Sequence, residues 1–344
     1  MRYIFLTAAL IFSAGNLFAA NTVDMMFGDV KSQSQGSNLW QKVSQGQTVR
    51  LGDTILTGVQ SFAVIDTGGN KIKVQPNTKV KFTQDMINDR QQSSLSLFSG
   101  SVNCKMDKLK KGNSSFSVNT ASSVCAVRGT EFDVASGADG NTVLQVTDGL
   151  VALSGMTKSV DVGKDQESSV KIGGEPEPVK IVKRQDWEKW ANEAGNDVKG
   201  KEKDIMEGCL AKTEKLDSDI TQLENERAAA KKRSDDLKIQ AEEAKKAGDK
   251  DRAMKLAVDA ERSRVISASL NNKAFYQASR IELVKGVADN AYNSSEDKAT
   301  VQKSYDRINS IYDKYFIKYI KPILDSEKLR QEIRDKKKLK NRNK

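Results

Sequence analysis

The sequence predicts an α+β protein with an all-β domain followed by a separate helical domain. Up to residue 174, short runs rich in β-branched residues alternate with glycine turns, which is the pattern of strands. Beyond residue 185, glycine becomes sparse and apolar residues recur at steps of three and four, which is the pattern of helices. Residues 175–185 form the linker, in which Pro176 and Pro178 alternate with glutamates and favour an extended chain.

Residues 1–20 have the pattern of a secretory signal peptide. Arg2 gives a positive start, residues 4–18 are largely apolar, and Ala19 and Ala20 offer a cleavage site. The apolar stretch is too short to count as a membrane span, and a retained amphipathic anchor is the alternative. We therefore expect an exported protein located in the periplasm, with secretion or surface association as alternatives.

The β domain is expected over residues 21–174. Apolar and small polar residues alternate at a period of two in Phe116-Ser117-Val118 and again in residues 143–146, as in strands with one buried face. Gly129 falls inside such a run, where a glycine marks a bulge or a close backbone approach. The spacing of the strands favours a solenoid-like or rolled sheet, and a two-sheet sandwich is the alternative.

Several segments of this domain resemble, in their order and spacing, the FecR domain, the periplasmic sensing module of iron-uptake signalling regulators. The segments are Val49–Gly58, Lys71–Thr78, Leu97–Val102, Val127–Phe132 and Thr147–Val151. The likeness covers roughly residues 22–174. One departure is Thr67-Gly68-Gly69-Asn70, which stands where the family has an Asp-Gly-Ser turn but still tolerates positive φ.

The resemblance implies a structural role for the matching residues, which would form turns and core and carry out no chemistry. These residues are Gly52, Asp53, Thr57, Gly58, Gly100, Arg128, Gly129, Thr130, Phe132 and Gly149. In the family's regulators the domain receives a signal from an outer-membrane transporter, and a cytoplasmic anti-sigma region and a membrane helix accompany it. Since neither is recognised here, we expect only the module itself to carry over.

Residues 186–333 are expected to form a helical hairpin or a three-helix bundle with coiled-coil character. Apolar or small residues recur at heptad spacing in Met206, Cys209, Thr213, Leu216, Ile220 and Leu223, and the seam continues in Ala230, Leu237, Ala241 and Ala244. A helix from Lys201 to Ala247 would be roughly 70 Å long. Such a seam suits antiparallel packing within one chain and a homo-oligomer equally well.

Residues that end or cap helices divide the helical domain into three helices. Gly248-Asp249 separates the first two, Ser294 with Asp297 resembles a cap at the start of the third, and Pro322 kinks or ends the third. The second helix carries Ile266 in its apolar seam. The third carries an aromatic stripe that we expect inside the bundle, with sugar or peptide binding as the alternative: Tyr305, Tyr312, Tyr315 and Tyr319.

The chain has 3 cysteines. Cys104 and Cys125 both fall in β segments, so in an oxidising compartment they form a disulfide if their strands are neighbours and stay free thiols otherwise. Cys209 lies in the helical seam, where we expect it to act as a small apolar residue; a crosslink between two chains is the alternative.

The composition argues against an enzyme. The chain contains 0 histidines, which excludes Ser-His-Asp and Cys-His sites and removes the commonest zinc ligand. Its glycine pairs lack the spacing of phosphate-binding loops. We therefore expect no catalytic residue, no cofactor and no metal. A cell-wall modifying enzyme with paired carboxylates is the catalytic alternative.

The net charge indicates which partners the protein can bind. The chain has 56 Lys+Arg against 46 Asp+Glu, a formal net charge of +10, and such a charge attracts an exported protein to anionic polymers. We expect no nucleic-acid partner, because export separates the protein from nucleic acid. The basic tail at 334–344 either solubilises the chain end or docks on an anionic lipid or a cell-wall polymer. We expect an envelope binding or scaffold module that engages a protein or glycan. The alternative is a cell-surface signalling component acting with a separate membrane anti-sigma or transporter partner.

Overall fold

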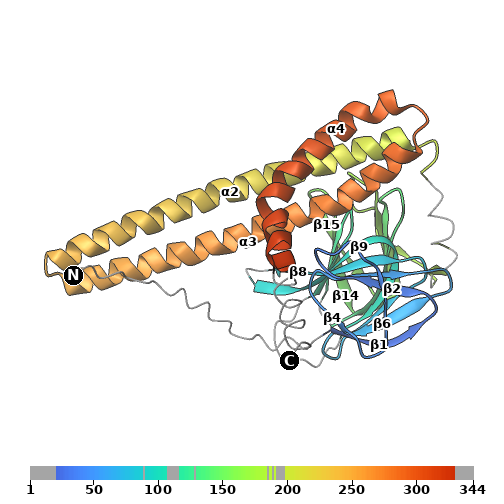
Figure 1. The fold of residues 1–344 in the computed structure, drawn as a ribbon, viewed down its shortest axis with the longest axis horizontal. Helices are drawn as coiled ribbons and strands as arrows, with labels where there is room; N and C mark the ends of the chain where they lie inside the picture. Colours follow the sequence, from blue (N-terminus) through green and yellow to red (C-terminus); the bar gives the residue numbers. More distant parts are fainter. Residues whose placement is uncertain are drawn as a thin grey trace, which may run out of the picture.

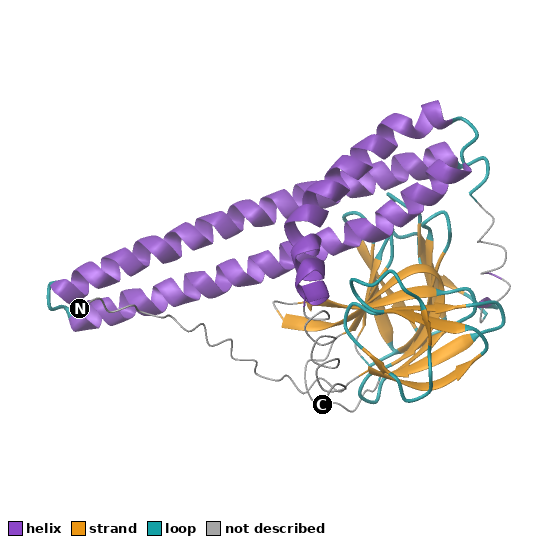
Figure 2. Ribbon diagram, viewed as in Figure 1, coloured by secondary structure: helices purple, strands orange, loops and turns teal. Residues whose placement is uncertain are grey.

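A computed structural model shows a β domain and, over residues 202–329, three helices along one side of it (Figures 1 and 2). The structure describes residues 21–87, 90–106, 116–127, 129–183, 186–187, 190 and 198–329. The predicted signal peptide, Arg128 and the basic tail lie outside the described residues. The predicted fold class, separate β and helical domains, is confirmed.

In the described part of the chain, seventeen strands form one continuous, mostly antiparallel sheet that consists of two ladders. Ladder A contains β1 (Asn21–Phe27), β4 (Thr48–Val49), β6 (Phe62–Asp66), β7 (Lys71–Val74), β12 (Glu131–Ser136), β13 (Thr142–Asp148), β16 (Gln166–Val170) and β17 (Lys180–Ile181). Ladder B contains β2 (Val30–Gln33), β3 (Gln41–Lys42), β5 (Thr54–Thr57), β8 (Lys79–Ile87), β10 (Phe116–Asn119), β11 (Val124–Val127), β14 (Leu150–Ser154) and β15 (Ser159–Gly163).

The strand β9 (Arg90–Lys105) belongs to both ladders and joins them. Its first half pairs with β8 and its second half with β7 and β12; between them Gly100 has a φ of 89°, a value that glycine adopts without strain. The inward side chains of both ladders, such as Leu95, Val102 and Phe132, are fully buried in one core. The rolled sheet follows from this alternation of buried and outward residues around a bent central strand.

Part of the predicted linker belongs to the sheet. Pro176 forms an isolated bridge with Val170, and β17 pairs with β16. The linker is therefore extended, as its prolines favour, but it lies along the β domain and adds an edge strand to it.

Two long helices form an antiparallel hairpin that extends well beyond the β domain (Figure 1). They are α2 (Glu202–Lys246) and α3 (Lys250–Ser294), each of 45 residues and so about 67 Å long. Gly248 in the tight turn has a φ of 82°. The Asp249 carboxylate accepts a hydrogen bond from the Arg252 N–H and caps α3, as its position predicts.

The third helix, α4 (Lys298–Tyr315), packs across the hairpin near the β domain. Its N-cap is Asp297, whose carboxylate accepts from the Thr300 N–H, so the cap predicted at Ser294 was wrong. Asp297 is the N-cap because its carboxylate lies at the first free N–H groups of α4, whereas Ser294 is still part of α3.

Pro322 does not end this helix. A π-helical turn, η1 (Phe316–Ile320), follows α4, and helix continues over 321–329. The Lys321 N–H bonds to the Phe316 carbonyl, five residues back, just before the proline that cannot donate. The wider turn adapts the hydrogen-bond ladder to the missing donor of Pro322.

The first half of the predicted seam is the interior of the hairpin. Met206, Cys209, Thr213, Leu216 and Ile220 are buried with residues of α3 and α4. Towards the tip the seam becomes thin and is built from small residues, where the buried Ser234 hydroxyl donates to the Ala260 carbonyl. Ile266 is 54% exposed, so its placement in the seam was wrong, because its position on α3 faces away from α2.

All three cysteines are buried and unbonded. Cys104 pairs within ladder A and Cys125 within ladder B, on strands that are not neighbours. The disulfide that the sequence left open is not formed in this structure. None of the helices in the described part of the chain has the length and apolar character that crossing a membrane requires.

Candidate functional site

A groove of about 1070 Å³ runs between the β domain and the helices. Its β side consists of the loop after β2, the turn before β5, outward residues of β8 and β9, and Asn119 at the end of β10. Its helical side consists of Arg227 of α2 and residues of α3, α4, η1 and the helix that follows. The volume is at the upper end of ligand pockets, which span about 300–1,000 Å³. The groove is therefore the candidate binding site.

Strand alternation supplies the floor of the groove. Val80 and Phe82 of β8 point into the core, so Lys79, Lys81 and Asp85 point outward, towards the helices. Two ion pairs link this face to α3. Lys81 Nζ lies 2.6 Å from a Glu282 carboxylate oxygen, and Arg280 Nη2 lies 2.5 Å from Asp85 Oδ2. Asp85 is almost fully covered, so the second pair fixes the helix on the sheet at one edge of the groove.

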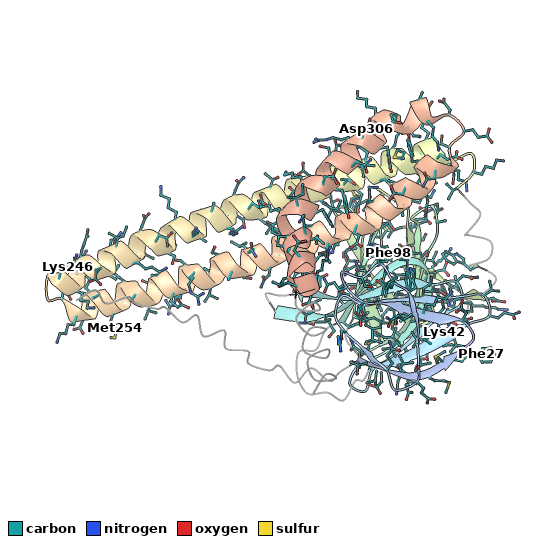
Figure 3. The ribbon with its side chains drawn as sticks, viewed as in Figure 1. Phe27, Lys42, Phe98, Lys246, Met254 and Asp306 are labelled. Carbon is teal, nitrogen blue, oxygen red and sulfur yellow. The ribbon has the colours of Figure 1, made fainter. Side chains whose placement is uncertain are left out.

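Phe98 of β9 is the main aromatic contact between the domains, and Figure 3 places it where the β domain meets the helices. Its ring packs against the helical core. The ammonium groups of Lys79 and Lys81 lie 5.0 and 5.6 Å from its centroid, within the range of cation–π interactions. Gly286 of α3 lies opposite, where a Cβ would be 4.0 Å from the ring.

Close glycine contacts hold the helices on the loops of the β domain. A Cβ placed on Gly208 of α2 would lie 2.5 Å from the Ile172 carbonyl oxygen, and one on Gly173 would lie 2.7 Å from Gly208. Gly140, in the turn after β12, approaches Val287 of α3 in the same way. Glycine weakens a helix by about 1 kcal/mol relative to alanine, so the tight docking explains its presence within α2.

A lysine of α2 is anchored beneath the same interface. Lys212 Nζ donates to the carbonyl oxygens of Ser122 and Gly155, both at 3.2 Å. Burial and, to a smaller extent, the positive charges of Arg280 and Lys215 together lower the pKa of this ammonium to about 8. Lys212 thus joins two loops of the β domain to α2, and among the described residues no carboxylate lies at hydrogen-bond distance from it.

The far wall of the groove carries aromatic residues of α4 and η1. Tyr312 stacks on Phe316 with ring centroids 5.5 Å apart. Burial raises the pKa of Tyr312 to about 12, so the phenol stays protonated. Tyr319 donates to a Glu224 oxygen at 2.7 Å. The aromatic stripe is thus divided: Tyr315 belongs to the helical core, as predicted, whereas Tyr312 and Tyr319 also line the groove.

Most residues that match the family pattern lie in turns and core of the β domain. The Asp53 carboxylate accepts from the Arg50 N–H at 2.9 Å, and burial raises its pKa despite this bond. Thr57 Oγ1 donates to the Gln75 carbonyl at 2.5 Å and accepts from the Thr78 N–H. Gly149 has a φ of 93°, and Phe132 is fully buried. Gly52 also borders the groove.

The structure does not gather these residues into one site. Gly58 lies against Asp29, Gly100 against Thr78, and Gly129 has a φ of 63°. Thr130 is 2% exposed. Within the described part of the chain, no group of three or more Cys, Asp or Glu side chains could hold a metal ion.

Sequence reasoning missed the groove itself. Its residues come from both domains, and no local pattern shows which outward face of a sheet a distant helix will cover. The tyrosine stripe was the available signal, because its sugar or peptide alternative pointed to the correct helix.

Residues 53–152 match the family model FecR, described as FecR protein, so the chain carries a FecR domain. A search of curated proteins finds no match. Two crystal structures of a proposed anti-sigma factor from Parabacteroides distasonis are similar to part of the chain. One has 16% sequence identity and a TM-score of 0.34, and the alignment covers 40% of this chain and 63% of that one. The other has 15% identity and a TM-score of 0.32, with 37% and 59% covered. The chain thus spans less than two thirds of either structure.

Proposed function

From the FecR domain at residues 53–152, we propose that the chain is an exported, non-catalytic binding module of the cell envelope. The family match supports a signalling-related role. The observation that carries the proposal is the groove between the two domains, because it is large, lies beside the FecR domain and has polar, charged and aromatic walls. In this proposal a protein or a glycan of the envelope occupies the groove.

The helical hairpin has a second part in this proposal. Its inner end forms one side of the groove, and its outer end, near Lys246 and Met254, lies far from the β domain (Figure 3). An arm of this length can separate the bound partner from a second component or set a spacing between them. The β domain and the inner half of the hairpin would act as one rigid body, since the ion pair of the buried Asp85 with Arg280 and the close glycine contacts join them.

Site-specific photo-crosslinking in intact cells tests the proposal. Leu51 borders the groove and is 46% exposed, so a photoreactive residue at this position can reach an occupant. Leu150 is a matched control, because it is the same residue type, is 54% exposed and lies outside the groove. We expect a discrete envelope adduct from position 51 only. Absence of any adduct there, or the same adducts from both positions, would remove the groove as the binding site.

The FecR match also favours a second function, a signalling component that acts through a separate membrane anti-sigma or transporter partner. This function predicts that deleting the gene changes a sigma-dependent set of transcripts under iron limitation. An unchanged transcript set would count against this signalling function and would leave the proposed binding in the groove untouched.

A further inference from the structure

We propose that the groove binds a carboxylate-bearing glycan chain. This inference rests on the proposed function and names the class of its ligand. The first argument is charge. Lining residues include three carboxylates, Asp85, Glu282 and Asp325, and each forms an ion pair with Arg280, Lys81 or Lys321.

The cations of the groove are not balanced in the same way. Within the described part of the chain, Lys79, Arg227 and Lys328 line the groove and form no ion pair with a carboxylate. They come from a strand, from α2 and from the C-terminal helix, so positive charge surrounds the groove on several sides. An anionic occupant would be attracted to the space between them.

The second argument is the chemistry of the walls. Rings of Phe275, Tyr312 and Phe316 line the groove, and their electron-rich faces attract the C–H groups of a sugar ring. Side-chain amides line it as well, and an amide both donates and accepts hydrogen bonds, as a sugar hydroxyl does. The amide side chains are Gln33, Gln35, Asn38, Gln84, Asn271 and Asn272.

The third argument is a pair of buried polar atoms without a partner. Asn119 is 4% exposed and lines the groove; its Nδ2 donates to Ser94 Oγ at 2.7 Å, while its Oδ1 has no hydrogen bond. Arg280 Nε is also buried and unbonded. Leaving a buried polar atom unpaired costs about 1–3 kcal/mol, so each such atom calls for an explanation, and a ligand bound beside it is one that fits both atoms. A hydroxyl-rich ligand offers the donor that Asn119 lacks and the acceptor that Arg280 lacks.

A glycan fits these observations better than an acidic peptide does. Peptides usually bind through a free sheet edge or through apolar side-chain pockets. The floor here is the outward face of β8 and β9, where Lys81 and Ser96 lie opposite each other in paired strands, and the polar lining is rich in amides. The π-helical turn η1 supports a functional role, because Phe316, Lys318 and Tyr319 belong to it and such turns are frequent at functional sites.

Isothermal titration calorimetry with the full chain tests the inference. The probe is a preparation of soluble peptidoglycan fragments released by lysozyme, and the matched control is the same preparation with its carboxyl groups amidated. Chitohexaose serves as a neutral glycan and poly-L-glutamate as an acidic peptide. We expect the fragments to bind, the amidated fragments to bind at least about tenfold more weakly, and poly-L-glutamate to bind more weakly than the fragments.

Variants locate the binding site. Each of Lys79→Gln, Arg227→Gln and Lys328→Gln should weaken binding about threefold, and the triple variant about 30-fold. Lys42→Gln is the control, because Lys42 is exposed and lies on the β domain away from the groove (Figure 3). Equal affinity for native and amidated fragments, tighter binding of poly-L-glutamate, or an unaffected triple variant would overturn the inference. If a protein adduct nevertheless forms from position 51, the proposed binding function stands and only the glycan is refuted.

Discussion

Replacing Gly208 with alanine tests whether the helices are docked on the β domain as tightly as the structure shows. In an isolated helix, replacing glycine with alanine stabilises the helix by about 1 kcal/mol. Here the new Cβ would lie 2.5 Å from the Ile172 carbonyl oxygen and 3.0 Å from its carbonyl carbon. Because these are backbone atoms, the helix has to move away, and overpacking of this kind costs about 1–3 kcal/mol. With the cost at the upper end of that range, Gly208→Ala should destabilise the protein by about 1–2 kcal/mol.

Gly286→Ala is the matched control, since Gly286 is also a glycine inside a long helix that faces the β domain. Its Cβ would lie 4.0 Å from Phe98, an ordinary contact. The free energy of unfolding of this variant should therefore increase by about 0.5–1 kcal/mol, which is the difference in helix propensity between alanine and glycine. Equilibrium denaturation followed by circular dichroism measures both variants, and hydrogen exchange at residues 172–174 reports local loosening. Our reasoning is refuted if Gly208→Ala is as stable as the natural protein, or if both variants change stability in the same direction.

Three further predictions concern buried groups. Burial lowers the pKa of Lys212 to about 8 from 10.5, so its unfolded-state ammonium binds more protons between these values, and Lys212 should contribute a rise in stability of about 1–2 kcal/mol from pH 7.5 to 9.5. The three buried thiols contribute a fall over the same range, so the measurement is the difference in pH dependence between the natural chain and Lys212→Met; equal pH dependence of the two would contradict the assignment. Asp85→Asn leaves the Arg280 guanidinium, whose side chain is 20% exposed, without its charge partner, so we expect a loss of about 1–3 kcal/mol, largely restored in the double variant Asp85→Leu/Arg280→Met; a single variant of natural stability would show that the pair does not stabilise the docked helix. Burial raises the pKa of the Cys104 and Cys209 thiols, and that of Cys125 to about 12, so iodoacetamide at pH 8 should label none of them before unfolding; a chain two hydrogens lighter by intact mass would instead reveal a disulfide.

Much of the fold could be predicted because it depends on local patterns. The period-two runs predicted the strands, and the steps of three and four predicted α2 from Met206 to Ile220. Gly248 and Asp249 predicted the turn between the long helices, since a left-handed glycine and a capping carboxylate act within a few residues. The hydrogen bond that the Asp53 carboxylate accepts from the Arg50 N–H could also be predicted, because the two residues are three positions apart in the same turn.

The errors arose where two local rules competed or where distant segments decided the outcome. Pro322 was expected to kink or end the last helix; it does not end it, because a π-helical turn precedes the proline and helix continues over 321–329. Ile266 looked like a seam residue, yet it faces away from the partner helix and is exposed. Whether Cys104 and Cys125 are bonded was left open by the sequence, because it depends on the fold, which places them unbonded on strands that are not neighbours.

By itself, the sequence determined the two kinds of domain, the absence of histidine chemistry and the long hairpin, because each of these depends on composition or on neighbouring residues. Only the tertiary structure decided where the groove lies and what lines it. Lys81 and Glu282 are 201 positions apart, and Asp85 and Arg280 are 195 apart. A periodic pattern shows which face of a strand points outward, whereas the packing of a distant helix determines what covers that face.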